Sequence, residues 1–471
     1  MVELHEVQVG AEQLERFRSV IGDERTDRFL ATAEAARDAL EDRTIWNVNS
    51  TASGGGVAEM LSVLLSYARG AGIDTRWLVI EGNAPFFDVT KRLHNRLHGA
   101  EGAGGLDADA ARVYEEVTQA NAEAFAELVR PGDIVLLHDP QTAGMIARTL
   151  ETGALVIWRA HIGTDRPNDN VREAWSFLEP YLRPAHGYVF SRKAHIHDWI
   201  PRERVTVVPP SIDPFAPKNQ DLPDAVVAAI LGRIGLLPGD GANPEFHRRD
   251  GSPGAVVRHA NLVRGSALPD AGRPAVVQVS RWDRLKDMSG VLQGFADGVP
   301  EPAELLLVGP SVEGVTDDPE GAEVLDECAR IWDGLPAAVQ DRIRLVCLPM
   351  EDLDENAAMV NAIQRHATIV VQKSLQEGFG LTVSEALIKE RAVVASAVGG
   401  IQDQIDHGVN GLLLDDPSDL DAMAASLRDL LGDDDRRQEL GRAGRATVLD
   451  RFVGDRHLIQ YAELFGALVA G

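Results

Sequence analysis

The residues best suited to chemistry lie in a loop at 376–386, which reads QEGFGLTVSEA and contains two glutamates and two glycines. The loop follows an apolar run at 369–372 that predicts a strand, and a helix is expected to begin near Leu381. The glycines let the backbone approach a ligand closely, and the free N–H groups at the helix start favour a phosphate. Glu377 and Glu385 can then reach hydroxyl groups at two ends of one elongated ligand, as a nucleotide sugar requires. A solvated glutamate and a helix-capping glutamate remain the alternative.

Two cations, Arg281 and Lys286, follow another predicted strand at 275–279. An arginine offers a fork of donors and a lysine a compact charge, and both suit a diphosphate. Ligands of open α/β sheets bind beyond the carboxyl ends of the strands, so this position favours phosphate binding. The alternative is a pair of ordinary surface cations.

A glycine-rich loop at 49–59 separates the first predicted strand from a helix. The backbone amides around Gly55 and Gly56 are able to form a concave anion-binding site. The loop is neither a complete GxGxxG fingerprint nor a phosphate-binding loop with its lysine. A tight turn is therefore the alternative to a binding role.

Two histidines lie at strand ends in the same half of the chain. His161 follows a predicted strand at 155–159, and His138 with Asp139 ends the strand at 134–138. A histidine in such a place can donate a hydrogen bond or shuttle a proton, and the His138–Asp139 pair can hold sugar hydroxyls. The alternatives are a structural histidine and a simple strand-to-loop turn.

These residues have to be positioned by strands that alternate with helices, a pattern that predicts βαβ units and parallel sheets. A proline-rich segment at 209–214 interrupts the pattern, because proline lacks the backbone N–H, and we predict a hinge there. The prediction is two Rossmann-like, doubly wound domains facing a central cleft, at 1–210 and 211–450, with an irregular insertion at about 233–273. The predicted strands are Thr44–Asn49, Arg76–Ile80, Ile134–His138, Leu155–Arg159, Tyr188–Phe190, Val205–Val208, Ala275–Val279, Leu305–Val308, Ile343–Leu348, Ile369–Gln372, Ala392–Ala395 and Gly411–Leu414.

The composition excludes several classes of protein. Among 471 residues, Asp and Glu number 73 against 46 Lys and Arg, and the resulting net charge of −27 repels nucleic-acid phosphates. Two cysteines cannot build a disulfide scaffold or a four-thiolate zinc site. The sequence contains neither a signal peptide nor the ~18 consecutive apolar residues of a membrane span. We therefore expect a cytoplasmic protein without nucleic-acid or membrane partners.

Two pairs of aspartates have the spacing of a known type of paired-aspartate metal site. They are Asp107 with Asp109 and Asp352 with Asp354. Both pairs precede helical patterns, where aspartate is favoured as an N-terminal cap. We therefore predict that they cap helices and that no metal is required.

The motifs together resemble glycosyltransferase family 4 and related retaining enzymes such as glycogen synthase. The spacing of Glu377 and Glu385 resembles the family signature, and Arg281 and Lys286 match the pair that holds the donor diphosphate in that family. Within the family, the chain most resembles the trehalose synthases of the glycosyl-transferring kind. The stretches that carry this resemblance are WNVNSTASGGGVAEML (46–61), VIEGNAPFFDVTKRLHNRLHG (79–99), HDPQTAG (138–144), WRAHIG (158–163), PPSIDPFAPKN (209–219), QVSRWDRLKD (278–287), QEGFGLTVSEA (376–386) and AVGGIQDQI (397–405).

The resemblance implies the GT-B fold, with a final helix at about 451–471 that crosses back onto the N-terminal domain. It also implies transfer of glucose from UDP-, ADP- or GDP-glucose to free glucose, with retention of anomeric configuration, giving α,α-trehalose without a further cofactor. The implied catalytic residues are His161, Glu377, Arg281 and Lys286. The implied donor site comprises Gly55, Gly56, Arg281, Lys286, Glu377, Gly378, Phe379, Gly380, Leu381, Thr382 and Glu385. The implied acceptor site comprises Asn49, His138, Asp139 and His161.

Four other readings stay open on the sequence. A retaining trehalose phosphorylase would place inorganic phosphate where the diphosphate binds, and a related transferase would use a different sugar acceptor. The glycine-rich loop suggests a nicotinamide-dependent dehydrogenase, although the acidic residue expected ~20 positions on is not clearly placed at Asp74 or Glu81. A non-catalytic sugar-binding protein would leave the paired cations and carboxylates without a purpose. The base of the donor, the direction of the reaction in the cell and the oligomeric state remain open, and a homodimer is compatible with the resemblance.

Overall fold

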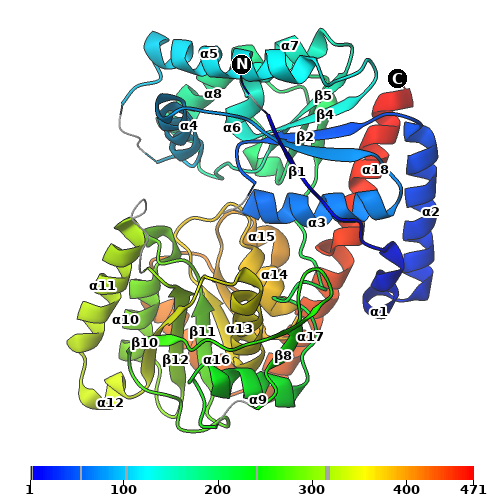
Figure 1. Ribbon diagram of the computed structural model, residues 1–471. Coiled ribbons are helices and arrows are strands. Elements are labelled where there is room, and N and C mark those ends of the chain that lie inside the picture. Colours follow the sequence, from blue (N-terminus) through cyan, green and yellow to red (C-terminus); the bar gives the residue numbers. More distant parts are fainter. Residues whose placement is uncertain are drawn as a thin grey trace. The chain divides into compact units, whose positions relative to one another are not determined.

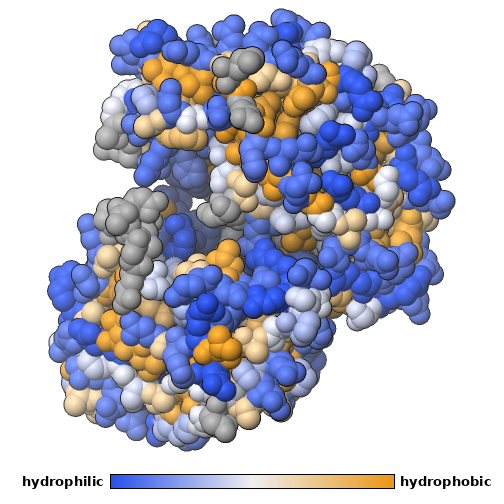
Figure 2. Space-filling view, viewed as in Figure 1, coloured by the Kyte–Doolittle hydropathy of each residue, from blue (hydrophilic) through white to orange (hydrophobic). Residues whose placement is uncertain are grey.

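The chain folds into two compact units, one formed by residues 1–211 with 454–471 and the other by 212–453. The computed structural model describes residues 2, 4–52, 56–100, 104–239, 242–312 and 319–470. Each unit is a parallel-sheet α/β domain (Figure 1). Hydrophilic residues cover much of the visible face, in keeping with the net charge of −27 (Figure 2).

The first unit is built on a seven-stranded sheet in the order β1-β3-β2-β4-β5-β6-β7. The β1 strand pairs antiparallel with β3, and the other pairs are parallel. The central strands are rich in Val, Ile and Leu and are buried throughout, as expected for a parallel sheet covered on both faces. The strands are β1 (His5–Val7), β2 (Ile45–Asn49), β3 (Thr75–Val79), β4 (Ile134–His138), β5 (Leu155–Ala160), β6 (Gly187–Phe190) and β7 (Val205–Val207).

The helices of the first unit pack on both sides of this sheet, and the final helix of the chain is one of them (Figure 1). They are α1 (Arg18–Ile21), α2 (Asp23–Leu40), α3 (Gly56–Gly70), α4 (Ala84–Leu97), α5 (Ala108–Ala126), α6 (Asp139–Thr142), α7 (Ile146–Leu150), α8 (Asp169–Leu182) and α18 (Gly454–Ala470). None of the helices in the described part of the chain is long and apolar enough to cross a membrane.

The second unit has a seven-stranded sheet in the order β10-β13-β12-β11-β14-β15-β16. Only β10 is antiparallel, and the order of the parallel strands reverses between β11 and β14. The strands are β10 (Asn261–Arg264), β11 (Ala275–Val279), β12 (Glu304–Pro310), β13 (Ile343–Leu348), β14 (Ile369–Gln372), β15 (Ala392–Ser396) and β16 (Leu412–Leu414). The helices are α9 (Asp224–Arg233), α10 (Met288–Gly298), α11 (Pro319–Asp333), α12 (Ala337–Gln340), α13 (Leu353–His366), α14 (Leu381–Leu387), α15 (Ile401–Gln404), α16 (Leu420–Leu431) and α17 (Asp434–Arg451).

The region 233–273, for which the sequence predicts an irregular insertion, contains short strands. A hairpin of β8 (Glu245–His247) and β9 (Pro253–Ala255) precedes the edge strand β10. Ion pairs hold the hairpin on the start of α13, where the Arg248 guanidinium donates to both carboxylate oxygens of Asp352 at 2.8 and 3.1 Å. These strands are short, and tertiary pairing rather than local apolar pattern stabilises them.

Helix α18 is tied to α2 by a buried ion pair. Arg25 donates from Nε and Nη2 to the two carboxylate oxygens of Asp455, at 2.7 and 3.0 Å, and the Asp455 side chain is fully buried. The two helices lie side by side at one edge of the unit (Figure 1). A buried carboxylate needs a bidentate partner, because an unpaired charge in the interior is costly.

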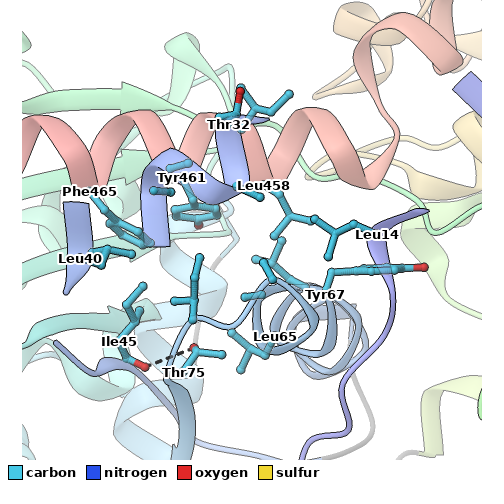
Figure 3. A pocket seen from close by; sticks show the side chains of 18 of the residues that line it. Leu14, Thr32, Leu40, Ile45, Leu65, Tyr67, Thr75, Leu458, Tyr461 and Phe465 are labelled. Atoms are coloured by element: carbon cyan, nitrogen blue, oxygen red, sulfur yellow. Dashed lines mark hydrogen bonds between the residues drawn. The ribbon is translucent and has the colours of Figure 1, made fainter. Parts of the chain in front are cut away.

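An apolar cavity lies between α2, α3, α18 and one face of the sheet (Figure 3). Small side chains leave this space open where the helices converge, among them Ala33, Ala36, Ala68 and Ala462. Asn47 of β2 and Thr75 of β3 are polar residues in the sheet face that borders it.

We expect Asp455→Ala to destabilise the protein by about 3–5 kcal/mol, because it leaves the Arg25 guanidinium without its buried partner. Urea unfolding followed by circular dichroism measures the change. Glu24→Ala is the matched control on α2, since the Glu24–Arg28 pair is exposed and such pairs contribute roughly 0–1 kcal/mol. Equal losses for the two variants would contradict the assigned role of the buried pair.

Candidate active site

The loop after β14 leads directly into α14, whose N-cap residue is Gly380. Gly380 has a φ of 82°, in the left-handed region that favours glycine, and no side chain caps the helix start. Thr382 in the first turn donates from its hydroxyl to Gln372 Oε1 at 3.0 Å and so joins the helix to the end of β14. Phe379 is largely buried and its ring lies edge-on to Phe452, with centroids 5.7 Å apart. The loop is thus held in one conformation on the sheet.

Glu377 forms an ion pair with Lys286, a residue 91 positions earlier in the chain. The Lys286 ammonium donates to Glu377 Oε2, and the side chains are 16% and 12% exposed. The Ser374 hydroxyl lies 3.4 Å from the same oxygen. The structure therefore brings together the two motifs that the sequence singled out, at the ends of the neighbouring strands β11 and β14.

The buried side-chain amide of Gln278 holds the Lys286 segment in place. Gln278 of β11 donates from Nε2 to the Lys286 carbonyl at 2.7 Å. The next residue, Asp287, has a φ of 48° and forms an ion pair with the fully buried Lys373, which follows β14. Sequence analysis missed Lys373, although its place directly after a strand is the signal that identified Lys286.

Arg281 occupies a more open position in the same segment. Its side chain is 69% exposed and donates to Asp283 Oδ2 at 2.7 Å. The neighbouring Arg284 is bound elsewhere, to Glu320, Glu323 and Glu327 at the surface. Arg281 therefore shares the segment with Lys286, while its guanidinium contacts Asp283 and not Glu377.

A pair of glycines at 399–400 allows the Glu377 loop to lie against the backbone after β15. A Cβ atom on Gly399 would lie 1.6 Å from the Glu377 carbonyl oxygen, and Gly399 itself has a φ of 51°. A Cβ on Gly400 would lie 2.5 Å from the Phe379 ring. Gly378, by contrast, has open space around its Cβ position, as a residue that faces a ligand should. The glycine pair could be recognised in the sequence, because AVGG precedes a helical pattern. The sequence did not show that this pair packs against the Glu377 loop.

Glu385 is buried in α14, with one turn of the helix between it and the loop. Its Oε1 lies 3.4 Å from the ammonium of Lys218, and the Lys389 ammonium donates to the Glu385 carbonyl at 2.7 Å and to Gln364 Oε1 at 2.8 Å. Burial lowers the pKa of Lys389 to about 7, against the opposing effect of Glu385. Neither lysine was identified from the sequence, because neither directly follows a predicted strand.

In the first unit, His138 and His161 form one hydrogen-bonded pair. Nδ1 of His138 lies 2.9 Å from Nε2 of His161, the two ring planes are within 10° of each other, and the centroids are 5.2 Å apart. The other nitrogen of His138, Nε2, lies 3.1 Å from Asn47 Oδ1. His138 is 1% exposed, so both ring nitrogens serve neighbouring side chains.

Asp139 and Arg159 surround this pair with opposite charges. Asp139 has a φ of 61° and accepts the His161 backbone N–H at 2.8 Å. Burial raises the pKa of Asp139 to about 7, although that N–H and Arg159 act in the opposite direction. Arg159 is fully buried and donates to the Val208 carbonyl at 2.8 Å. Burial, reinforced by Arg159, lowers the pKa of His138 to about 3 and that of His161 well below its ordinary value.

The remaining predicted residues of this unit differ in what surrounds them. Asn49 is 3% exposed, accepts from Trp77 Nε1 at 2.8 Å and donates to the Thr51 carbonyl at 2.8 Å. Gly56 begins α3 and has open space at its Cβ position. Gly55 lies outside the described residues.

The first aspartate of each of the two pairs caps a helix. Asp107 accepts from the Ala110 N–H at the start of α5, and Asp352 accepts from the N–H groups of Asp354 and Glu355 at the start of α13. Within the described ranges, no group of three or more His, Cys, Asp or Glu side chains is arranged to hold a metal ion.

Comparisons with known proteins by sequence and by structure give the same result. Family models described as "Trehalose synthase, N-terminal domain" and "Glycosyl transferases group 1" match residues 47–197 and 353–447. The chain is 34% identical to the trehalose synthase of Thermococcus litoralis over 97% of both chains. It is 25% identical to the trehalose phosphorylase of Grifola frondosa, covering 93% of this chain and 59% of that one.

Among solved structures, the fold matches an α,α-trehalose-phosphate synthase (UDP-forming) from Burkholderia vietnamiensis. The TM-score is 0.65 at 17% sequence identity, and the match covers 91% of this chain and 99% of that one. At this identity the likeness establishes the fold, which is GT-B.

We expect Gly399→Ala to lower the transfer rate at least tenfold, because the new Cβ would overlap the Glu377 carbonyl and force the loop to move. Initial rates and the melting temperature are the two measurements. Gly334→Ala is the control, since its Cβ would meet its nearest atom at an ordinary 3.5 Å. A Gly399→Ala protein with the wild-type rate would show that the loop position is not needed.

Proposed function

The chain belongs to the trehalose synthase family of GT-B glycosyltransferases, and from this premise we propose that it transfers glucose from a nucleoside diphosphate glucose to free glucose, forming α,α-trehalose with retention of configuration. The observation that carries the proposal is the Lys286–Glu377 pair. It places a cation and a carboxylate at the switch point of the second sheet, between β11 and β14. Ligands of doubly wound sheets bind at this point.

The donor is assigned to the second unit by matching its groups to the parts of a nucleotide sugar. Lys286 and Arg281 neutralise the diphosphate, for which they exchange their present partners Glu377 and Asp283. Glu377, helped by the amides of Gly378 to Gly380, then accepts hydrogen bonds from the glucose hydroxyls. Glu385, 6% exposed in α14, binds the ribose.

Departure of the leaving group puts negative charge on the diphosphate and positive character on the sugar. Preorganised cations and the uncapped start of α14 stabilise that negative charge, and this electrostatic contribution is commonly the largest in enzyme catalysis. Because Arg281 and Lys286 supply positive charge, we propose that no metal is required. The acceptor hydroxyl attacks from the same face as the leaving group, and the departing phosphate oxygen takes its proton. A trapped covalent glucosyl–enzyme intermediate would contradict this route.

The acceptor is assigned to the first unit, where His161 contacts a sugar hydroxyl. A second candidate function is a retaining trehalose phosphorylase, which the 25% identity to a protein of that name favours. The same cations would then hold inorganic phosphate, so the two functions differ in the co-substrate and not in the fold.

Incubation with glucose and a panel of UDP-, ADP- and GDP-glucose is expected to give α,α-trehalose and the nucleoside diphosphate, with turnover that persists in EDTA. Proton NMR of the disaccharide identifies the linkage. A parallel incubation with trehalose and inorganic phosphate, without nucleotide, is the control for the phosphorylase. Phosphorolysis in that tube and no disaccharide in the others would overturn the proposal in favour of the second candidate.

Arg281→Ala with Lys286→Ala is expected to weaken binding of the nucleoside diphosphate by about 100-fold or more, because each of the two charge-assisted interactions contributes roughly 1.5–3 kcal/mol. Isothermal titration calorimetry measures the dissociation constant. Arg284→Ala is the matched control from the same segment, since its guanidinium pairs with surface glutamates. An unchanged affinity in the double variant would show that the diphosphate does not bind at Arg281 and Lys286.

A further inference from the structure

The imidazole of His161 is the last member of a chain of hydrogen bonds that begins deep in the first sheet. His161 Nε2 lies 2.9 Å from His138 Nδ1, and His138 Nε2 lies 3.1 Å from Asn47 Oδ1. Asn47 Nδ2 in turn lies 3.5 Å from the hydroxyl of Thr75, which lies 3.2 Å from the Ile45 carbonyl. Each imidazole and each amide in this row of hydrogen bonds can have its donor and acceptor atoms exchanged. Which ring nitrogen of His161 carries the proton therefore depends on the group at the other end of the row, the Ile45 carbonyl.

The origin is unambiguous because a backbone carbonyl can only accept. The Thr75 hydroxyl has a single proton, which it donates to the Ile45 carbonyl (Figure 3). Its oxygen can therefore only accept from Asn47, and the amide nitrogen of Asn47 has to face Thr75. The carbonyl oxygen of Asn47 then faces His138, which fixes the orientation of this amide.

The same logic carries outward through the two histidines. His138 has to donate from Nε2 to the Asn47 oxygen, so Nδ1 of a neutral His138 is left as an acceptor. Burial and the nearby Arg159 lower the pKa of His138 to about 3, which keeps the ring neutral at pH 7. His161 therefore carries its proton on Nε2 and donates it to His138. Its Nδ1 is left with a lone pair, and among the described residues this nitrogen has no hydrogen-bond partner.

We propose that Thr75 and Asn47 are positioning residues which, through His138, fix His161 in the Nε2–H tautomer and so present its Nδ1 as a hydrogen-bond acceptor to a hydroxyl of the substrate sugar. The part that concerns the sugar rests on the proposed function. Such an acceptor selects a ligand group that donates, and a hydroxyl can do so where an ether or carbonyl oxygen cannot.

The buried surroundings of these side chains favour one arrangement of donors and acceptors in the row of hydrogen bonds. Asn47, Thr75 and His138 are 3%, 1% and 1% exposed, and the cavity that Asn47 and Thr75 border is otherwise mainly apolar, so their polar groups have few alternative partners (Figure 3). The charged and titratable groups near the two rings are Arg159, Asp139 and His457. Asp139 binds the backbone N–H of His161 and leaves the ring free, while Arg159 opposes a second proton on either ring.

The tautomer can be measured without any assay of activity. In protein labelled with ¹⁵N-histidine, a long-range ¹H–¹⁵N NMR correlation distinguishes protonated from unprotonated ring nitrogens, and the His161→Gln variant assigns the signals of His161. We expect Nε2 to be protonated and Nδ1 unprotonated at pH 7. A proton on Nδ1 of wild-type His161 would overturn the proposal, whether or not the protein makes trehalose.

The anchor is tested by Thr75→Val, which keeps the side-chain shape and removes the hydroxyl. The amide of Asn47 is then free to turn, and we expect a His161 population protonated on Nδ1, with kcat/KM lowered about 10- to 100-fold because a donor replaces the acceptor. Thr75→Ser should restore the wild-type spectrum and rate. Thr149→Val is the matched control, since Thr149 is equally buried and donates to the Met145 carbonyl away from the chain, and it should change neither. An unchanged His161 spectrum in Thr75→Val would overturn the proposal.

Discussion

Both candidate sites depend on one topological constraint, the point where the order of parallel strands reverses. In the second unit, β11 and β14 are neighbours although the chain between them forms β12 and β13, so their carboxyl ends lie at one edge and successive loops diverge there. Lys286 and Glu377 follow these two strands, and each is mostly buried with the other as its ion-pair partner. The first unit has its own reversal at β2, which lies between β3 and β4; Asn47 comes from β2 and His138 from the neighbouring β4.

The parts of the fold that follow from local pattern could be predicted from the sequence. Buried runs such as 134–138 and 369–372 are apolar up to their last residue, and the structure has β4 and β14 at those residues. The strand β1 was missed because it has only three residues, two of them polar, and its partner β3 lies far away in the chain. The short strands of the region 233–273 escaped for the same reason, since pairing and ion pairs with α13 hold them.

The residues of the candidate site also fall into those that local sequence pattern predicts and those that depend on tertiary packing. The loops after strands β11 and β14 were recognisable from their glycines and charged residues. Lys286 and Glu377 could therefore both be assigned to the donor site from the sequence. Contacts that depend on tertiary packing could not be found, such as the 1.6 Å approach that leaves room only for glycine at 399, or Lys218 beside Glu385. His138, which the sequence assigned to the acceptor site, contacts His161 and Asn47 through its two ring nitrogens, and these contacts could be found only from the structure.

The buried side chains of the two candidate sites differ in their partners, and this difference suits the two halves of the proposed reaction. In the first unit, desolvation together with the buried Arg159 lowers the pKa of both histidines, so the rings are neutral and act through oriented hydrogen bonds. In the second unit, Lys286 and Lys373 lie beside carboxylates and form ion pairs with Glu377 and Asp287. Sugar hydroxyls are recognised by neutral, directional acceptors, whereas a diphosphate has to be matched by charge.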